Sequence, residues 1–337
     1  MSTRQSRNAR SGVGALLLVG SAAVGVVQFY RPETQPPSVP FAHLSAALAA
    51  EVPPTATPTP DAFGRSGEVK VRFARPGAGI EFPLAVEGSA EALSYQWVSV
   101  VDSAVVGPVL PLNAAFPIVP EQPGFYHLSV LHGERRQIVA EPTVAVIVPF
   151  ERKLGQWLNG YRIGEYLAER IGGKHERPEG FIEVRPELLG LSLSRHIKLA
   201  DFVTHDEQIN VWPKYVVVDP LLLDKLELVL TDIGERAHAD LSVDVHSGFR
   251  APAHNRGVRR AARDSRHQYG DAADVQIDAN GDGRIDMTDE LLVMLAVERV
   301  EDAHPDLVGG LGMYTSRRYR TPYLHIDTRG KRSRWHG

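Results

Sequence analysis

The chain has 337 residues, of which 43% are hydrophobic, 37 are basic and 41 are acidic, so its formal net charge is −4. This length favours two domains with additional segments, and the charge balance argues against nucleic acid as a partner of the whole chain. The sequence contains no cysteine, which excludes disulfides, thiol chemistry and cysteine-ligated zinc. Any bound metal must therefore be held by histidine and carboxylate side chains.

Residues 1–30 predict a membrane-targeting segment. Three arginines precede an apolar run from Gly12 to Val27, and Phe29 and Tyr30 follow it. A basic flank, an apolar core and an aromatic border are typical of a segment whose positive end stays in the cytoplasm. We expect an inner-membrane anchor that places the later residues in the periplasm of the cell envelope. The alternative is a cleaved signal peptide and a secreted chain.

Two segments follow the targeting segment. Residues 31–66 are rich in Pro, Ala and Thr, which predicts an extended spacer, or linker. Residues 67–149 contain β-branched and aromatic runs such as "LSYQWVSV" and "FYHLSV", separated by Pro and Gly. This pattern predicts a small all-β sandwich of the immunoglobulin or PKD type, without a catalytic constellation.

From residue 150 the composition predicts a mixed α+β domain that extends to residue 337. A helix is expected after Asp219, which suits the N-cap, with Pro220 at the first helical position. A strand ending in a glycine turn is expected at 241–249, and a second helix begins at "TDELLVMLAVERV". "GGLGMY" and "PYLHID" predict two short strands. The basic tail "RGKRSRWHG" is expected to be a solvated end.

Histidine and aspartate side chains in this domain have the spacing of a metal site. His267 and Asp274 are seven residues apart with Gly270 between them, and the glycine permits a tight turn. A catalytic zinc needs three protein ligands and an open fourth position. His325, on the expected strand "PYLHID", supplies the third ligand.

Three sequence blocks in this order resemble the zinc peptidases of the D-Ala-D-Ala-peptidase and hedgehog fold. The blocks are "SGFRAPAHN", "SRHQYGDAAD" and "LGMY…PYLHID". The resemblance covers residues 150–337 and implies zinc held by His267, Asp274 and His325. It also implies that the enzyme hydrolyses peptidoglycan stem peptides or cross-links, as an endopeptidase or a D,D-carboxypeptidase. Peptidoglycan is then the expected partner.

The sequence offers several candidates for the catalytic groups beside the metal. Arg250 is expected to stabilise the developing oxyanion or to hold a substrate carboxylate. Relatives often place an acid or a histidine two or three residues before the last ligand, but Pro322 and Tyr323 stand there. Asp327 is therefore a candidate for the general base, and equally for a group that orients a ligand. Tyr323 is expected to contact the substrate, and His246 and His254 are candidates to line the cleft.

The stretch 278–289, "DANGDGRIDMTD", fits the calcium-loop template. The template assigns as calcium ligands Asp278, Asn280, Asp282, the carbonyl of Arg284, Asp286 and Asp289. An aspartate at the last position resembles the loops of dockerins. The sequence therefore predicts Ca²⁺ next to Zn²⁺. The alternatives to a peptidase are a catalytically inactive, metal-stabilised cell-wall binding module and a calcium-dependent adhesion factor.

Overall fold

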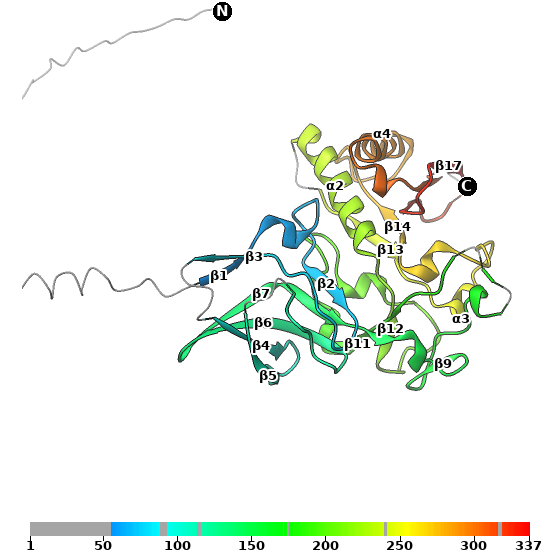
Figure 1. Cartoon of the computed structure of the whole chain (residues 1–337). Helices are drawn as coiled ribbons and strands as arrows, with labels where there is room; N and C mark the ends of the chain where they lie inside the picture. Colours follow the sequence, from blue (N-terminus) through cyan, green and yellow to red (C-terminus); the bar gives the residue numbers. More distant parts are fainter. Residues whose placement is uncertain are drawn as a thin grey trace, which may run out of the picture. The chain divides into compact units, whose positions relative to one another are not determined.

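The computed structural model describes residues 55–87, 93–112, 116–170, 172–173, 175–238, 241–315 and 319–337. The predicted membrane segment 1–30 lies outside these residues. No helix in the described part is both long and apolar enough to cross a membrane. The described residues belong to one compact unit of the chain, and it is a mixed α+β structure with few helices (Figure 1).

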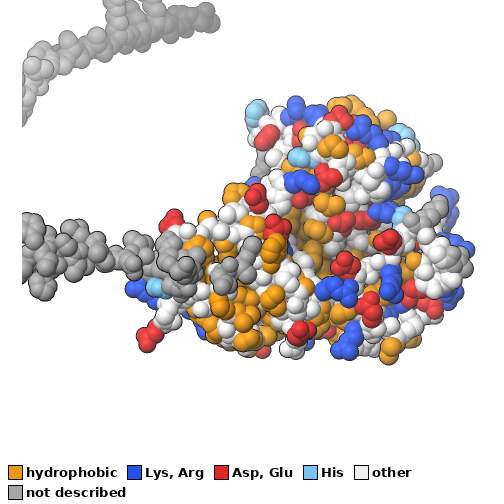
Figure 2. All heavy atoms as spheres, viewed as in Figure 1, with side chains coloured by type: hydrophobic (Ala, Val, Ile, Leu, Met, Phe, Trp, Pro, Cys, Tyr) orange, Lys and Arg blue, Asp and Glu red, His pale blue; other side chains and the backbone are white. Residues whose placement is uncertain are grey.

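The first sheet has the strand order β2-β7-β6-β4-β5. Its strands are β2 (Val71–Ala74), β7 (Arg135–Val146), β6 (Gly124–His132), β4 (Ser94–Ser99) and β5 (Val105–Pro111). In β4, Tyr95 and Trp97 point to the same face of the sheet and are both 3% exposed. Val105 and Val109 of β5 are exposed, and Figure 2 shows hydrophobic side chains gathered on the face of the molecule where Figure 1 draws this sheet.

A two-stranded ribbon of β1 (Thr55–Pro58) and β3 (Leu84–Glu87) lies against the first sheet. The predicted spacer 31–66 is thereby corrected at its end, because β1 and the 3-10 helix η1 (Pro60–Phe63) are folded. Ala56 is fully buried, and the side-chain amide of Gln137 hydrogen-bonds its N–H (3.1 Å) and its carbonyl (2.7 Å). The proline-rich composition predicted an extended spacer and gave no sign of this strand. The immunoglobulin-like topology stays a prediction.

The two faces of the first sheet enter different cores. Tyr126 and Val144 pack with the β1–β3 ribbon, whereas Phe125, Ala145 and Val71 pack into the core of the C-terminal residues. Phe125 is 2% exposed in that shared core. One of the two cores therefore extends across the predicted boundary at residue 150, and the other lies entirely before it.

Short elements connect this part to the C-terminal sheet. They are β8 (Val148–Pro149), η3 (Phe150–Arg152), β9 (Trp157–Leu158), β10 (Tyr161–Arg162), η4 (Leu167–Glu169), β11 (Gly180–Val184), η5 (Pro186–Leu188), η6 (Leu199–Phe202) and β12 (Lys214–Val216). Strands β12, β11 and β8 form a three-stranded sheet, and β9 and β10 form a hairpin.

The C-terminal sheet has the order β13-β14-β16-β15-β17. Its strands are β13 (Asp244–Ser247), β14 (Ala272–Gln276), β16 (Tyr323–Asp327), β15 (Gly310–Tyr314) and β17 (Ser333–His336). Neighbours are antiparallel except β15 and β17, which are parallel. Strand β17 corrects the expectation of a solvated tail, because Arg334 pairs with Glu298 and Glu301 and thereby holds the strand in place.

The helices associated with this sheet are α2 (Pro220–Ala237), α3 (Pro252–Asn255), η7 (Arg266–Tyr269), α4 (Met287–Ala303) and η8 (Pro305–Leu307). Helix α2 begins as predicted, since the Asp219 side chain accepts a hydrogen bond from the Leu221 amide (2.9 Å). Helices α2 and α4 lie side by side (Figure 1) and bury their apolar residues with one face of the sheet. Ala273 and Val275 of β14 point into this core, so the residue between them, Asp274, points to the opposite face.

Candidate metal centre

His267 of η7 is held by a close approach to the turn that follows β13. Its Nδ1 lies 2.8 Å from the carbonyl oxygen of Gly248, which can only accept, so Nδ1 carries the proton and Nε2 keeps its lone pair. A Cβ at Gly248 would lie 2.7 Å from the carbonyl oxygen of Asp201. The glycine of the "SGF" motif therefore lets the end of β13 pack closely on Asp201 while its carbonyl accepts from His267.

The turn between His267 and Asp274 depends on Gly270. Its φ is +72°, and a Cβ there would lie 2.3 Å from the carbonyl oxygen of Val217. The turn leads directly into β14, where Asp274 stands opposite His325 of β16 in the antiparallel register. Directly opposite residues on one face have Cβ atoms about 4.5–5.5 Å apart, so the register brings both side chains to the same point.

Three ligand atoms converge there. His267 Nε2 lies 3.2 Å from both Asp274 Oδ1 and His325 Nδ1, and the last two atoms are 2.9 Å apart. Ligands of a tetrahedral zinc at 2.0–2.1 Å are separated by about 3.3 Å, so the spacing suits a zinc ion. Among the described residues this is the one group of at least three His and acidic side chains with converging ligand atoms.

Asp327 lies behind His325. Its Oδ2 is 2.9 Å from His325 Nε2, which therefore carries the proton and leaves Nδ1 free for a metal. The Asp327 carboxylate is fully buried and also accepts hydrogen bonds from the Gly310 amide (2.7 Å) and from Arg329. Of the two roles expected for Asp327, this position favours orientation of the ligand over proton transfer.

Arg250 contacts the remaining oxygen of the ligand carboxylate. Its Nη2 donates to Asp274 Oδ2 (3.0 Å) and to Ser247 Oγ (3.1 Å). The side chain is largely buried, and its main-chain amide donates to the carbonyl of His267 (3.0 Å). The arginine thus fixes which oxygen of Asp274 points to the metal position.

The charges of the ligands favour a cation at this point. Burial lowers the pKa of His267, which keeps the imidazole neutral. Burial would raise the pKa of Asp274, but the two histidines outweigh it and hold that pKa well below the usual value. Burial opposes a charge on His325 as well, yet Asp274 and Asp327 raise its pKa. The negative potential that favours a proton on His325 also favours a metal ion.

The three ligand side chains line a cleft of about 610 Å³, and the wall of this cleft carries several cationic side chains. Arg259, Arg260 and Lys331 line it. Within the described residues these three have no carboxylate partner, unlike Arg250, Arg266 and Arg329. The cleft therefore suits an anionic ligand.

Aromatic side chains form one side of the cleft. Tyr323 is stacked on Tyr314, with ring centroids 4.6 Å apart, and Trp335 Nε1 donates to the Tyr314 hydroxyl (2.9 Å). Burial raises the pKa of Tyr323, so its hydroxyl stays protonated at neutral pH. His246 and His254 line a smaller hollow that also touches Arg250, Asp274 and Tyr323.

The predicted calcium loop turns around its first positions. Asp278 Oδ2 accepts from the Gly283 amide (2.7 Å), and Asn280 Oδ1 accepts from the Asp282 amide (2.9 Å). The Asp286 side chain caps α4, and the fully buried Asp289 accepts from three main-chain amides. Arg284 is exposed. The loop's acidic side chains do not form a converging group like the one at His267, so calcium stays a prediction.

Several contributors to the site had no clear sequence signal. Gly248 acts through its carbonyl, and Trp335 comes from the tail that was expected to be solvated. Arg329 follows the ligand strand directly in "HIDTRG", and this proximity was the available sign of its contact with Asp327.

Residues 208–290 match a protein-family model described as Peptidase M15. The matched segment contains Arg250, His267 and Asp274 but ends before His325. The match supports the D-Ala-D-Ala-peptidase type of zinc peptidase that the three sequence blocks resemble. No curated protein and no solved structure matches the chain.

Proposed function

We propose that the chain is a zinc-dependent peptidase that hydrolyses amide bonds in peptidoglycan stem peptides or cross-links. The observation that carries the proposal is the convergence of His267 Nε2, Asp274 Oδ1 and His325 Nδ1 at the base of an open cleft. The match to the M15 peptidases supports the same reaction class. Three ligands with an open side suit a catalytic rather than a structural zinc, which favours an enzyme over an inactive binding module.

Zinc held by these three side chains would lower the pKa of a water molecule toward neutrality and polarise the scissile carbonyl. The protein's own groups orient this chemistry. Gly248 and Asp327 fix the tautomers of the two histidines, and Arg250 fixes the Asp274 carboxylate. Arg250 lines the cleft and can also donate to an oxyanion or a substrate carboxylate. Tyr323 is proposed to hydrogen-bond the substrate.

Asp327 is proposed as a positioning residue and not as the general base. Its two oxygens already accept hydrogen bonds from His325, Gly310 and Arg329. A group in this position raises the basicity of the ligand and holds the ring.

The remaining parts of the proposal concern location and calcium. Peptidoglycan lies outside the cytoplasm, which is consistent with residues 1–30 as an anchor or a cleaved signal. The loop 278–289 is proposed to bind Ca²⁺, supported by its template spacing and by the turn that Asp278 and Asn280 make.

The test is incubation of the full chain with purified peptidoglycan and defined muropeptides, with and without chelator, followed by mass analysis of the products. We expect chelator-sensitive cleavage that His267→Ala abolishes. His132→Ala, a histidine on the first sheet, is the matched control and should keep full activity. No cleavage by a chain with one bound zinc would move the assignment to a metal-stabilised binding module.

A further inference from the structure

A second cavity, of about 670 Å³, lies where the first sheet meets the C-terminal residues. Its apolar wall comes from β2, the link between β7 and β8, β11 and the residues before α2. It includes Val71, Phe73, Ile147, Ile182 and Val217. Ligand pockets are commonly 300–1,000 Å³, mostly apolar, and placed where two substructures meet. The cavity has the size and position of a binding site, and it is separate from the metal cleft.

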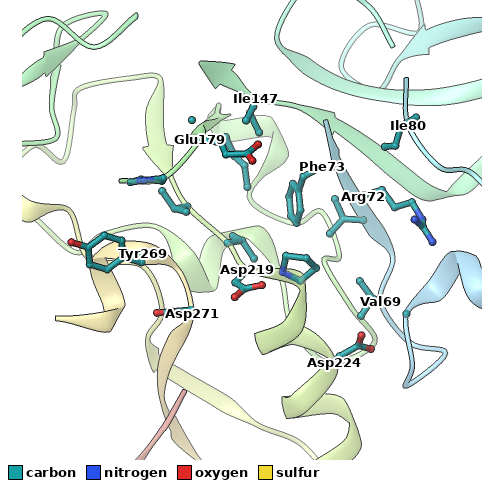
Figure 3. A pocket seen from close by; sticks show the side chains of 18 of the residues that line it. Val69, Arg72, Phe73, Ile80, Ile147, Glu179, Asp219, Asp224, Tyr269 and Asp271 are labelled. Atoms are coloured by element: carbon teal, nitrogen blue, oxygen red, sulfur yellow. The ribbon is translucent and has the colours of Figure 1, made fainter. Parts of the chain in front are cut away.

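Acidic side chains form the other side of this cavity. In Figure 3, Asp271, Asp219 and Asp224 lie along one side, and Phe73 and Ile147 lie on the other. The hydroxyl of Thr328 is 3.5 Å from Asp219 Oδ2 and 3.4 Å from the carbonyl of Asp271, so these two aspartates are neighbours.

The hydrogen bonds of the three aspartates show which oxygens remain open. Asp224 is occupied, because it accepts from the Arg65 amide and from the amide and hydroxyl of Ser66. Asp271 is 5% exposed and is not open either, because its Oδ2 pairs with Arg266 and its Oδ1 is buried away from solvent. Asp219 Oδ1 caps α2, whereas its Oδ2 has only the long contact from Thr328.

The local charge is negative at this point. Burial raises the pKa of Asp219, and this effect outweighs the opposing charge of Arg266, which pairs with Asp271. Arg72 also lines the cavity, but its guanidinium donates to the carbonyls of Ala62 (3.1 Å) and Asp61 (2.7 Å) and is turned away from Asp219 in Figure 3. The exposed Glu179 adds a further negative charge to the lining.

We propose that this cavity binds a ligand with a primary ammonium group at the end of an apolar chain. The ammonium lies against Asp219 Oδ2, which has only the long contact from Thr328, and its remaining N–H donors bind water in the cavity. The apolar chain lies against Phe73 and Ile147. A buried carboxylate is costly without a partner, so a cation is the chemistry that this lining lacks.

The experiment is calorimetric titration of the zinc-loaded full chain, near neutral pH, with three probes of equal length: hexylamine, 1-hexanol and hexanoate. We expect hexylamine to bind at one site, hexanol to bind at least tenfold more weakly, and hexanoate not to bind. Asp219→Asn and Asp219→Ser both keep a good N-cap and should weaken hexylamine at least tenfold. Glu179→Gln removes one charge from the same lining but not from the ammonium position, so it should change the affinity by less than twofold.

The proposal is overturned if hexanol binds as tightly as hexylamine, if both Asp219 variants bind hexylamine like the original chain, or if no probe binds at tens of millimolar. Unfolding curves of the two Asp219 variants check that the helix remains folded. No hydrolysis is measured, so this result is independent of the peptidase proposal.

Discussion

The substitution Asp327→Asn tests how the second histidine is oriented. Asp327 Oδ1 accepts from the Gly310 amide (2.7 Å), and Oδ2 lies 2.9 Å from His325 Nε2. An asparagine keeps an oxygen toward Gly310 and therefore turns its NH₂ group toward Nε2. Because NH₂ only donates, His325 must move its proton from Nε2 to Nδ1, the atom that faces the metal.

The expected loss is large and specific to metal binding. Replacing such a partner typically reduces metal affinity about 10- to 100-fold, which corresponds to about 1.4–2.8 kcal/mol. Zinc affinity is measured on metal-free protein by competition with a chromophoric chelator, and hydrolysis is measured at saturating zinc. Asp302→Asn is the control, because Asp302 also pairs with an arginine but its side chain is 70% exposed; neither quantity should change.

One result would refute this reasoning. If Asp327→Asn bound zinc within twofold of the original chain yet had no activity, Asp327 would be the general base and its place behind His325 would be misjudged.

The remaining predictions concern other parts of the chain. Arg250→Lys keeps the positive charge but not the planar guanidinium that contacts Asp274 and Ser247. We expect kcat to fall at least tenfold while the zinc content stays unchanged. Loss of zinc from this variant would contradict the prediction. Phe125→Ala should lower the free energy of unfolding by about 3–5 kcal/mol within a single calorimetric transition, whereas two transitions would argue against a shared core. Calcium should raise the unfolding temperature of the original chain but not that of Asp282→Asn, and equal shifts in both would refute the calcium loop.

The parts of the fold that sequence predicted are those encoded by local patterns. The cap at Asp219 depends on one side chain and the adjacent amides, and it formed as expected. The convergence of His267, Asp274 and His325 followed from the resemblance of three motifs, and the structure brings the three together.

The parts that sequence missed depend on distant partners. Ala56 became a buried strand residue because Gln137, 81 positions away, supplies hydrogen bonds to its backbone. The basic tail became β17 because Glu298 and Glu301 of α4 neutralise Arg334. The position of Asp327 behind the His325 ring depends on the strand pairing and on Arg329. The alternation of side chains along a strand does not by itself determine this position.

The shared core of the first sheet and the C-terminal residues has a mechanical consequence. Phe125 and Ala145 are buried in the same core as the helices that support the ligand strands. A hinge between the two parts would have to expose this apolar surface at each opening, at a cost of about 25 cal/mol per Å². The first sheet is therefore a fixed extension of the C-terminal part, and force applied at β1 would reach β14 and β16 instead of being absorbed by a flexible joint. A fragment cut at residue 150 would lose one wall of its core along with the sheet.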